Sequence, residues 1–352
     1  MKVLVTGGCG FLGSNLASSF INSGEEVYVV DSLIRKGSTE NMQWLLQHSS
    51  TKGSLKICNF DIADPDKVDS FFRDNGPFNY ICHVAGQVAM TTSLKDPRKD
   101  FNTNILGTFN ILESLRKYSP TSLIAYSSTN KVYGDLNWLT YNEMPKRYII
   151  EEHPKGLNED IPLDFTTPYG CSKGAAEQYV KDWGKTYGLN TVIFRHSSIY
   201  GGRQFASIDQ GWIGWFCQQA LEQEKDKINK KVSQPFTISG TGKQVRDVLH
   251  ANDLVNLYRK AYKHKNKLNG EVFNIGGGYS NSLSLLELFE FLESYLDIPK
   301  LIYIKNQRRK SDQDVFIASI DKVRDFLNWE PSIGYEEGIS EMVKWCRVLK
   351  EK

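Results

Sequence analysis

The chain of 352 residues is 40% hydrophobic and 24% charged, and its formal net charge at pH 7 is +2. This composition is that of an ordinary globular protein and excludes a disordered chain, while the near-neutral charge excludes a strongly basic surface for nucleic acid. No stretch approaches the length and apolarity of a membrane span, and the opening residues lack the apolar run of a signal peptide, so we expect a cytoplasmic protein without a membrane partner.

The six cysteines are scattered along the chain, with no C-x-x-C pair and no histidine spacing suited to zinc. Such scattered cysteines are typical of reduced, structural thiols. The sequence therefore predicts neither a disulfide framework nor a metal site.

A glycine-rich turn follows the first predicted strand, residues 3–5, and leads into a predicted helix. Gly8-x-Gly10-x-x-Gly13 fits the dinucleotide-binding fingerprint, and Gly7-x-x-Gly10-x-x-Gly13 fits its short-chain variant. In this arrangement the glycines let a pyrophosphate approach the N-terminus of the helix. The turn therefore predicts a dinucleotide site.

Asp31 closes the second predicted strand, residues 27–30, eighteen positions beyond Gly13. A carboxylate at this place is suited to the adenosine ribose and repels a 2′-phosphate, which favours NAD over NADP. The neighbouring Arg35 and Lys36 leave NADP open, and the alternative for Asp31 is an ordinary turn residue.

Strand and helix patterns alternate through the N-terminal half of the chain. Further strands are predicted over residues 55–60, 80–84, 122–126 and 191–194, and a long helix over residues 99–118. This alternation predicts an α/β fold with a doubly wound parallel sheet, the Rossmann arrangement, and right-handed crossovers.

The alternation becomes less regular in the C-terminal part. Helices are predicted over residues 211–224, 251–264, 283–296 and 335–350, and short strands near 235–238, 246–249, 272–275 and 314–318. This pattern predicts a smaller, mixed domain after the Rossmann domain.

We expect residues 1–195 to form the dinucleotide-binding domain and residues 196–352 a substrate-binding domain, with a return of the chain to the first domain near residues 245–262. The polar and aromatic segment 134–168 is long for a connection, and such a segment is usually functional or mobile.

Tyr169 and Lys173 stand four residues apart at the start of a predicted helix, so both side chains leave the same face. A phenol has an ordinary pKa of about 10, and its use as a base near pH 7 needs a neighbouring cation that lowers this pKa by roughly three units. In isolation the pair is more often a half-buried aromatic residue and a solvated lysine. Whether the pair is catalytic therefore depends on other motifs in the chain.

The glycine turn, the strand end Ser127-Ser128-Thr129 and the Tyr169-x-x-x-Lys173 pair together resemble the extended short-chain dehydrogenase/reductase family. Five further segments resemble the nucleotide-sugar branch of that family, namely residues 83–86, 104–108, 132–134, 246–250 and 274–277. This resemblance covers almost the whole chain. It implies a fold that binds NAD and a nucleotide sugar, and a homo-oligomer, either a dimer or a tetramer.

The resemblance implies a catalytic set of Thr129, Tyr169 and Lys173. In the family the tyrosine is the acid/base, the lysine holds the nicotinamide ribose and lowers the tyrosine pKa, and the threonine positions the sugar hydroxyl. Cofactor contacts are implied for Gly7, Gly10, Phe11, Leu12, Gly13, Asp31, Asp61, Ile62, Ala85, Gly86, Gln87, Asn104, Tyr169 and Lys173. Substrate contacts are implied for Gln87, Thr129, Asn130, Ser198, Arg203, Arg246 and Arg309.

Arg246 and Arg309 match the diphosphate-binding arginines of the family, and Arg203 is a weaker third. The planar guanidinium suits this role because it binds phosphate oxygens through two hydrogen bonds at once. For Arg308, Arg309 and Lys310 the alternative is a solvated basic run.

For other polar residues the sequence allows either a role in the site or a structural role. For Gln87 and Asn130, contacts to the sugar and hydrogen bonds within their own loops are equally open. His83 and His196 are expected to be interior histidines with satisfied hydrogen bonds rather than catalysts.

The residues after Thr129 indicate which reaction type of the family to expect. Dehydratases of the family have Thr-Asp-Glu here, because loss of water needs its own acid and base, whereas this chain has Thr129-Asn130-Lys131. We therefore expect oxidation of a carbinol to a ketone, followed by return of hydride to the opposite face.

The segments 127–135 and 209–212 further resemble the CDP-sugar 2-epimerases, while Ser198 stands where 4-epimerases usually have asparagine. The resemblance thus implies inversion at C2 of a CDP-sugar. Two alternatives stay open, a UDP-hexose 4-epimerase and a cofactor-sensing scaffold that has lost the chemistry.

Overall fold

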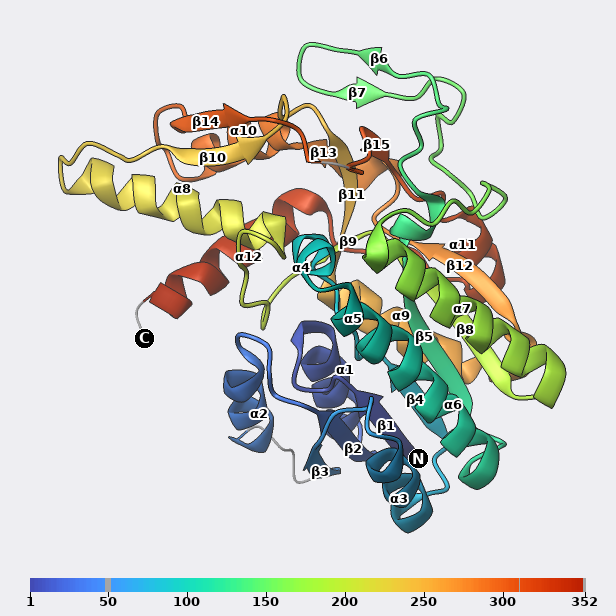
Figure 1. Ribbon diagram of the computed structural model, residues 1–352. Coiled ribbons are helices and arrows are strands. Elements are labelled where there is room, and N and C mark those ends of the chain that lie inside the picture. The colour runs from blue at the N-terminus through green and yellow to red at the C-terminus, as the bar shows by residue number, and fades with distance from the viewer. Residues whose placement is uncertain (48–51, 310, 351–352) are drawn as a thin grey trace.

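The computed structural model describes residues 1–47, 52–309 and 311–350 and has one large sheet at its centre (Figure 1). This sheet has the strand order β12-β8-β5-β4-β1-β2-β3, and every neighbouring pair is parallel. Its strands are β1 (Lys2–Thr6), β2 (Glu26–Asp31), β3 (Ser54–Asn59), β4 (Tyr80–His83), β5 (Leu123–Thr129), β8 (Asn190–His196) and β12 (Glu271–Ile275). The predicted doubly wound parallel sheet is confirmed.

Helices cover both faces of this sheet and bury its apolar strands. One face packs against α1 (Phe11–Asn22), α2 (Ser38–Gln47), α9 (Ala251–Lys263) and α11 (Asp321–Leu327). The other face packs against α3 (Pro65–Asn75), α6 (Gly107–Tyr118) and α7 (Thr167–Tyr187). The strand order reverses between β1 and β4, and a crevice at the carboxyl ends beside such a reversal is where open α/β sheets bind ligands.

The helix predicted over residues 99–118 consists of three helical parts in the structure. They are α5 (Pro97–Asp100), the π-helical turn η1 (Phe101–Leu106) and α6. A short helix, α4 (Met90–Lys95), precedes them. Single π-turns inserted in a helix are frequent at functional sites, and this one contains the fully buried Asn104.

The C-terminal part forms a second layer of smaller sheets. Four strands, β9 (Ser198–Tyr200), β11 (Val245–His250), β13 (Ser282–Ser284) and β15 (Val315–Phe316), form one sheet, and β10 (Phe236–Ser239) pairs with β14 (Tyr303–Asn306). An apolar cluster joins α8 (Trp212–Ile228), α10 (Leu285–Tyr295) and α12 (Tyr335–Lys350). Short 3-10 turns are η2 (Asn130–Tyr133), η3 (Lys265–Lys267) and η4 (Tyr279–Asn281).

The chain returns to the large sheet through α9 and β12, and again through α11 and the buried Trp329. These returns extend beyond the predicted segment 245–262. A short apolar strand such as Glu271–Ile275 carries no local signal of which sheet it joins, so the sequence pattern found the strand without its partner.

The segment 134–168 contains a small hairpin of β6 (Asn142–Glu143) and β7 (Tyr148–Ile149), which lies away from the large sheet at the top of Figure 1. Its apolar residues share a cluster with β11 and β15. Lys243 pairs with Glu143, and Arg147 pairs with Glu287. The insertion is therefore fastened to the C-terminal sheets.

Across residues 1–47, 52–309 and 311–350, no helix is both long and apolar enough to cross a membrane. The same residues hold no cluster of histidine, cysteine and carboxylate side chains suited to a metal ion. All six cysteines are free thiols.

Candidate active site

The glycine turn between β1 and α1 lies where side chains would not fit. A Cβ on Gly13 would lie 2.1 Å from the carbonyl oxygen of Gly7, and a Cβ on Gly7, whose φ is +68°, would lie 2.7 Å from the Cα of Ala85. Gly10 precedes the first turn of α1 and offers no side chain over its N-terminus. Phe11 and Leu12 form that first turn. The N-terminus of α1 is therefore left uncovered by side chains, and the N–H groups of its first turn fit a dinucleotide pyrophosphate.

Asp31 ends β2 beside this turn, and both of its carboxylate oxygens accept backbone hydrogen bonds. Cys9 N donates to one at 2.9 Å, and Leu33 N donates to the other at 2.8 Å. Burial raises the pKa of Asp31, while these hydrogen bonds and the charge of Arg35 act in the opposite direction. The carboxylate is thus oriented by the backbone at the place predicted for the ribose.

Asp61 and Ile62 follow β3 on the adjacent edge of the sheet. The Asp61 carboxylate accepts a hydrogen bond from Ala63 N at 2.9 Å. Ile62 is buried, its carbonyl accepts from Asn110 Nδ2 at 2.9 Å, and its side chain lies against Gly107. Both residues stand on the same side of the sheet as Asp31, since β2 and β3 are parallel neighbours.

The loop after β4 is held by Asn104 from the π-helical turn. Gln87 N donates to Asn104 Oδ1 at 2.8 Å, and Asn104 Nδ2 donates to Ser172 Oγ at 2.9 Å. A Cβ on Gly86 would lie 3.7 Å from Lys173 Nζ. Asn104 therefore joins the loop 85–87 to the helix of Lys173.

The Gln87 side chain forms hydrogen bonds within its own region, one of the two roles left open by the sequence. Its Nε2 donates to the carbonyl of Ala89 at 2.9 Å and to Asp100 at 3.2 Å. Its Oε1 accepts from Ala89 N at 2.7 Å. Among the described residues, these bonds therefore use both the Nε2 and the Oε1 of the Gln87 side chain.

Tyr169 lies in the first turn of α7, and its phenol lies near Thr129 at the end of β5. Burial raises the pKa of Tyr169, and the negative charge of Asp100 adds to this, while the nearby Thr129 hydroxyl and the charge of Arg35 lower it. The sequence argument expected a lowered phenol pKa, but among the described residues the cost of burying a phenolate is the larger effect. Tyr169 is therefore a protonated phenol in this state.

Lys173 lies one turn further along α7, and its ammonium donates to the carbonyl of Ser127. The ammonium also lies 4.3 Å from the centre of the Tyr126 ring. Burial lowers the pKa of Lys173 to about 7, and the negative charge of Glu177 opposes this shift. Lys173 thus contacts the same strand, β5, whose end carries Thr129 beside Tyr169.

Arg35 is a residue whose role the sequence argument missed. It was considered only as a partner for a 2′-phosphate, yet its positive charge acts on both Tyr169 and Asp31. A signal for this was its position four residues after Asp31, which ends β2.

His83 and His196 are interior residues with hydrogen-bond partners. His83 contacts Thr6 Oγ1 at 2.6 Å and Thr108 Oγ1 at 3.0 Å, and His196 contacts Ser127 Oγ at 3.2 Å. Burial lowers the pKa of both to about 3, and the charge of Lys173 adds to the shift. Both are neutral near pH 7.

A buried ion pair joins α7, which carries Tyr169 and Lys173, to the neighbouring strands. Glu177, on α7, accepts hydrogen bonds from Arg195 at 2.6 Å and from Ser128 Oγ at 2.5 Å. Arg195 also donates to Tyr133 OH at 2.8 Å, and Tyr133 OH donates to Asn274 Oδ1 at 2.7 Å. The pair links α7, β5, β8 and β12. Sequence analysis did not single out Glu177, although it stands one helical turn after Lys173.

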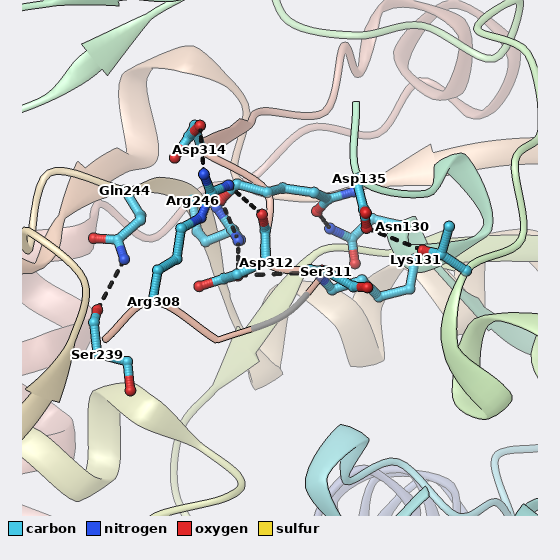
Figure 2. A network of polar contacts seen from close by, with 12 residues as sticks. Asn130, Lys131, Asp135, Ser239, Gln244, Arg246, Arg308, Ser311, Asp312 and Asp314 are labelled. Atoms are coloured by element: carbon cyan, nitrogen blue, oxygen red, sulfur yellow. Dashed lines mark hydrogen bonds and ion pairs between the residues drawn. The ribbon is translucent and has the colours of Figure 1, made fainter. Parts of the chain in front are cut away.

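Arg246 and Arg308 lie near Asn130 and Lys131 in a network with two carboxylates (Figure 2). Arg246 pairs with Asp312 at 2.7 Å, and Arg308 pairs with Asp314 at 3.1 Å. Arg309 donates to the carbonyl of Ile208 at 3.3 Å. Lys310 lies outside the described residues.

Asn130 and Lys131 reach the same network from the end of β5. Asn130 Nδ2 donates to Gln313 Oε1 at 3.0 Å, and Lys131 Nζ donates to the carbonyl of Ser311 at 3.2 Å. Thr129 Oγ1 in turn contacts Asn130 Oδ1 at 3.4 Å. The arginine network is therefore connected to Thr129 through Gln313 and Asn130.

Arg203 makes its contacts elsewhere. Its guanidinium lies 4.7 Å from the ring centres of both Trp44 and Trp345, and its Nε donates to Asn41 Oδ1 at 2.9 Å. These partners lie on α2 and α12. The contacts therefore join Arg203 to α2 and α12 and not to Arg246.

Ser198 also contacts neighbouring protein. Its Oγ accepts a hydrogen bond from Trp212 Nε1 at 3.2 Å. Because Trp212 opens α8 and Ser198 lies in β9, this bond holds the start of α8 against the small sheet.

A Rossmann sheet with a glycine turn, an acid at the end of β2 and a Thr-Tyr-Lys site defines a dinucleotide-dependent enzyme class. The sequence pattern of the NAD dependent epimerase/dehydratase family matches residues 3–276, and the chain belongs to this family. The resemblance predicted from the motifs is confirmed. The family's cofactor is NAD, and the glycine cradle and Asp31 fit it.

Among individual proteins, the chain is similar to CDP-paratose 2-epimerase of Salmonella typhi, with 50% identity over 98% of this chain and 99% of that protein. The structure is similar to that of UDP-glucose 4-epimerase with UDP-glucose from Thermotoga maritima, with a TM-score of 0.80 and 27% identity over 99% of this chain and 100% of that one. It is also similar to the UDP-glucose 4-epimerase of Thermus thermophilus in complex with NAD, with a TM-score of 0.78 and 25% identity over 99% of each chain.

Proposed function

We propose that this protein is an NAD-dependent nucleotide-sugar epimerase that inverts C2 of CDP-paratose and forms CDP-tyvelose. The observation that carries the proposal is the site itself, in which Thr129 lies near the phenol of Tyr169 and Asn130 and Lys131 stand where a dehydratase has an acid and a base. The 50% identity to CDP-paratose 2-epimerase supports the choice of sugar and base.

The chemistry of the sugar favours direct oxidation at C2. A 3-deoxy sugar has no hydroxyl at C3, and a ketone at C4 would acidify hydrogens at C3 and C5 but not at C2. Removal of an unactivated C–H proton is prohibitively slow, so a 2-keto sugar is the reasonable intermediate. NAD, when bound, supplies the hydride acceptor and donor for this conversion.

The residues of the chain move and position the proton. In the proposal Thr129 holds the C2 hydroxyl, and Tyr169 takes its proton during oxidation and returns one to the keto oxygen during reduction. Lys173 holds the cofactor ribose and stabilises negative charge on the phenol. Inversion also requires that the ketosugar turn over within the site while its diphosphate stays bound.

The remaining site residues follow the same proposal. Gly7, Gly10, Gly13 and Asp31, with their neighbours in the implied cofactor set, hold NAD, and Arg246 with Arg309 holds the diphosphate. Residues 1–195, with the later returns to the large sheet, form the cofactor domain, and residues 196–352 supply the substrate domain. We further propose a cytoplasmic homo-oligomer, either a dimer or a tetramer, and light scattering of the purified protein measures that state.

Incubation with CDP-paratose, followed by carbon-resolved NMR of the product, tests the function. The expected product is inverted at C2, with no net formation of NADH, because hydride returns within each cycle. The matched control is UDP-glucose, the substrate class of the 4-epimerases. Inversion confined to C4 would assign the protein to the 4-epimerases, and the absence of turnover with either sugar would favour a scaffold.

Denaturation of the purified protein and assay of the supernatant tests the cofactor separately. We expect NAD in the supernatant, because the cofactor is not consumed. Recovery of NADP instead would show that Asp31 does not select the ribose and that Arg35 or Lys36 serves a 2′-phosphate.

A further inference from the structure

The segment after Arg308 carries two carboxylates into the proposed diphosphate site. Asp312 lies between Arg246 on β11 and Lys131 at the end of β5 (Figure 2). Arg246 Nη2 lies 2.7 Å from Asp312 Oδ1, and Lys131 Nζ lies 3.9 Å from the same oxygen. One carboxylate oxygen is therefore shared by two cations from different layers of the protein.

The contacts of Arg246 occupy its guanidinium so that neither pair of neighbouring N–H donors is available for bidentate binding of a phosphate. Nη2 donates to Asp312 Oδ1 at 2.7 Å and to the carbonyl of Gln313 at 2.8 Å, and Nη1 donates to the carbonyl of Val245 at 2.7 Å. A guanidinium has five N–H donors, and both of its two-donor edges include Nη2. A diphosphate can bind in this bidentate way only if one Nη2 partner leaves.

Asp312 is the partner able to leave. The other acceptors on Arg246 are main-chain carbonyls, whereas Asp312 contributes a side chain that is 23% exposed. A carboxylate left beside an arriving diphosphate would add like-charge repulsion. Rotation toward Lys131, already 3.9 Å away, gives that charge a new partner.

We propose that Asp312 holds Arg246 in the place of a diphosphate oxygen when no substrate is bound, and that the arriving diphosphate displaces Asp312 onto Lys131. Lys131 is then a positioning residue that favours substrate binding by accepting the displaced carboxylate. This inference rests on the proposed function, because it takes Arg246 as a diphosphate ligand. It also explains why the chain has a cation immediately after Asn130, where a dehydratase has its catalytic carboxylate.

The exchange predicts that the effects of Lys131 and Asp312 on CDP affinity depend on each other, although the two residues are 181 positions apart in the sequence. With saturating NAD, titration calorimetry with CDP is expected to show that Lys131→Met weakens binding by about tenfold, because displaced Asp312 then lacks a cation. Asp312→Asn is expected to bind CDP at least as tightly as the unaltered protein. The double variant is expected to bind like Asp312→Asn alone.

Matched controls separate this coupling from a general loss of charge. Lys117→Met and Asp325→Asn remove one lysine and one carboxylate from exposed ion pairs, with Asp69 and Arg324 respectively. Both controls are expected to leave CDP affinity unchanged. If Lys131→Met does not fold, Lys131→Arg keeps a cation at the same place and is expected to keep most of the affinity, while Asp312→Asn alone still tests the release of Arg246.

Distinct outcomes overturn distinct parts of the proposal. A double variant as weak as Lys131→Met would mean that Lys131 contacts the ligand itself, and weaker binding by Asp312→Asn would mean that Asp312 supports the ligand. Either result would overturn the exchange while leaving the diphosphate site intact. No binding of CDP or UDP by the unaltered protein would overturn the diphosphate site and the exchange with it.

Proton uptake provides a second measurement on the same variants. Burial, as the largest cause, lowers the pKa of Lys131 to about 8; the charges of Arg246 and Arg308 lower it further, and those of Asp312 and Asp135 raise it. Transfer of Asp312 to Lys131 and neutralisation of Arg246 by the ligand would both raise this pKa. At pH 8, where about half of a group with this pKa is neutral, CDP binding is expected to take up about 0.5 proton.

Calorimetry in two buffers of different ionisation enthalpy measures this uptake. Lys131→Met is expected to abolish it, because the titrating group is gone. Asp312→Asn is expected to reduce it strongly, because the carboxylate that raises the pKa of Lys131 in the bound state is gone. Full uptake in Asp312→Asn would show that the ligand alone charges Lys131, and full uptake in Lys131→Met would place the proton elsewhere; each result would overturn the exchange.

Discussion

The two halves of the site, which we propose bind the cofactor and the substrate, differ in how their charged groups are held. On the cofactor side, the first turn of α1 offers backbone N–H groups, and Asp31 is oriented by the backbone donors of Cys9 and Leu33. On the substrate side, Arg246 and Arg308 are already paired with Asp312 and Asp314. The first half is built from rigid backbone, and the second from side-chain ion pairs that can change partners.

This difference suits the two ligands of an epimerase. A cofactor that is regenerated in each cycle can remain on a preformed site, whereas a substrate must enter and leave in every turnover. Exchangeable ion pairs keep the arginines neutralised between turnovers without a permanent block. The experiments below separate groups that perform chemistry from groups that hold the two halves together.

The largest effect is expected from Tyr169→Phe, which removes the phenol proton and little else. Because general acid/base groups contribute about 10²- to 10⁴-fold, we expect turnover of CDP-paratose to fall by at least 10³-fold with little change in thermal stability. Tyr179→Phe, on the exposed side of the same helix, is the control and should retain full activity. Normal turnover by Tyr169→Phe would remove Tyr169 from the mechanism.

Glu177→Ala is expected to give the next largest effect, on the free energy of unfolding. It leaves Arg195 buried without its counter-charge and Ser128 without its acceptor, a change that costs about 3–5 kcal/mol. Chemical denaturation measures the loss. The matched control is Glu113→Ala, which breaks a more exposed ion pair with Arg116 and should cost less than about 1 kcal/mol. Equal losses in the two variants would mean that the buried pair is not a structural centre of the site.

A smaller effect is expected from pH acting through His83 and His196. Their folded pKa values, about 3, lie below the value of about 6.5 in an unfolded chain. The unfolded chain therefore binds protons first as the pH falls, so the stability that these residues provide is complete above about pH 6.5 and is lost toward pH 3. Each contributes a slope of at most about 1.4 kcal/mol per pH unit in that window.

The measurement compares His196→Gln with the unaltered protein in urea at pH 5 and pH 7. Asp247, whose pKa burial raises to about 7, gives a slope of opposite sign over part of this window, so the difference between variants is more informative than either curve. We expect the unaltered protein to lose more stability than His196→Gln on going to pH 5. His264→Gln at a half-buried position is the control, and parallel losses in all three proteins would contradict the predicted role of burial.

Much of the cofactor half could be predicted because its signals are local. A strand, a glycine turn and a helix occur within the first 22 residues, and Tyr169 and Lys173 are one turn apart on one helix. Parallel strands place their carboxyl ends at one edge, so Asp31, Gly86 and Thr129 had to meet there.

The substrate half was harder to predict because its contacts join distant segments. The sequence located Arg246 and Arg309 through a family resemblance, but nothing near Lys131 indicates Asp312 as its partner. Strands such as Ser198–Tyr200 and Ser282–Ser284 are too short to show a period of two and form only because β11 supplies both of them with a partner. The position of Arg203 depends on aromatic residues that come from two other helices.

The smallest effect is expected from Arg203→Met, which tests whether this arginine belongs to the diphosphate site or to the packing between the two layers. In the structure its guanidinium is enclosed by Trp44 and Trp345, and each such cation–π contact contributes about 0.5–1 kcal/mol. We expect a loss of about 1–2 kcal/mol in the free energy of unfolding and less than a threefold change in CDP affinity. Arg246→Met is the matched comparison, with the opposite expectation of a much larger loss in CDP affinity. A large loss of CDP affinity in Arg203→Met would instead return Arg203 to the substrate site, as the family resemblance implies, and would require its guanidinium to leave the two tryptophans when the ligand binds.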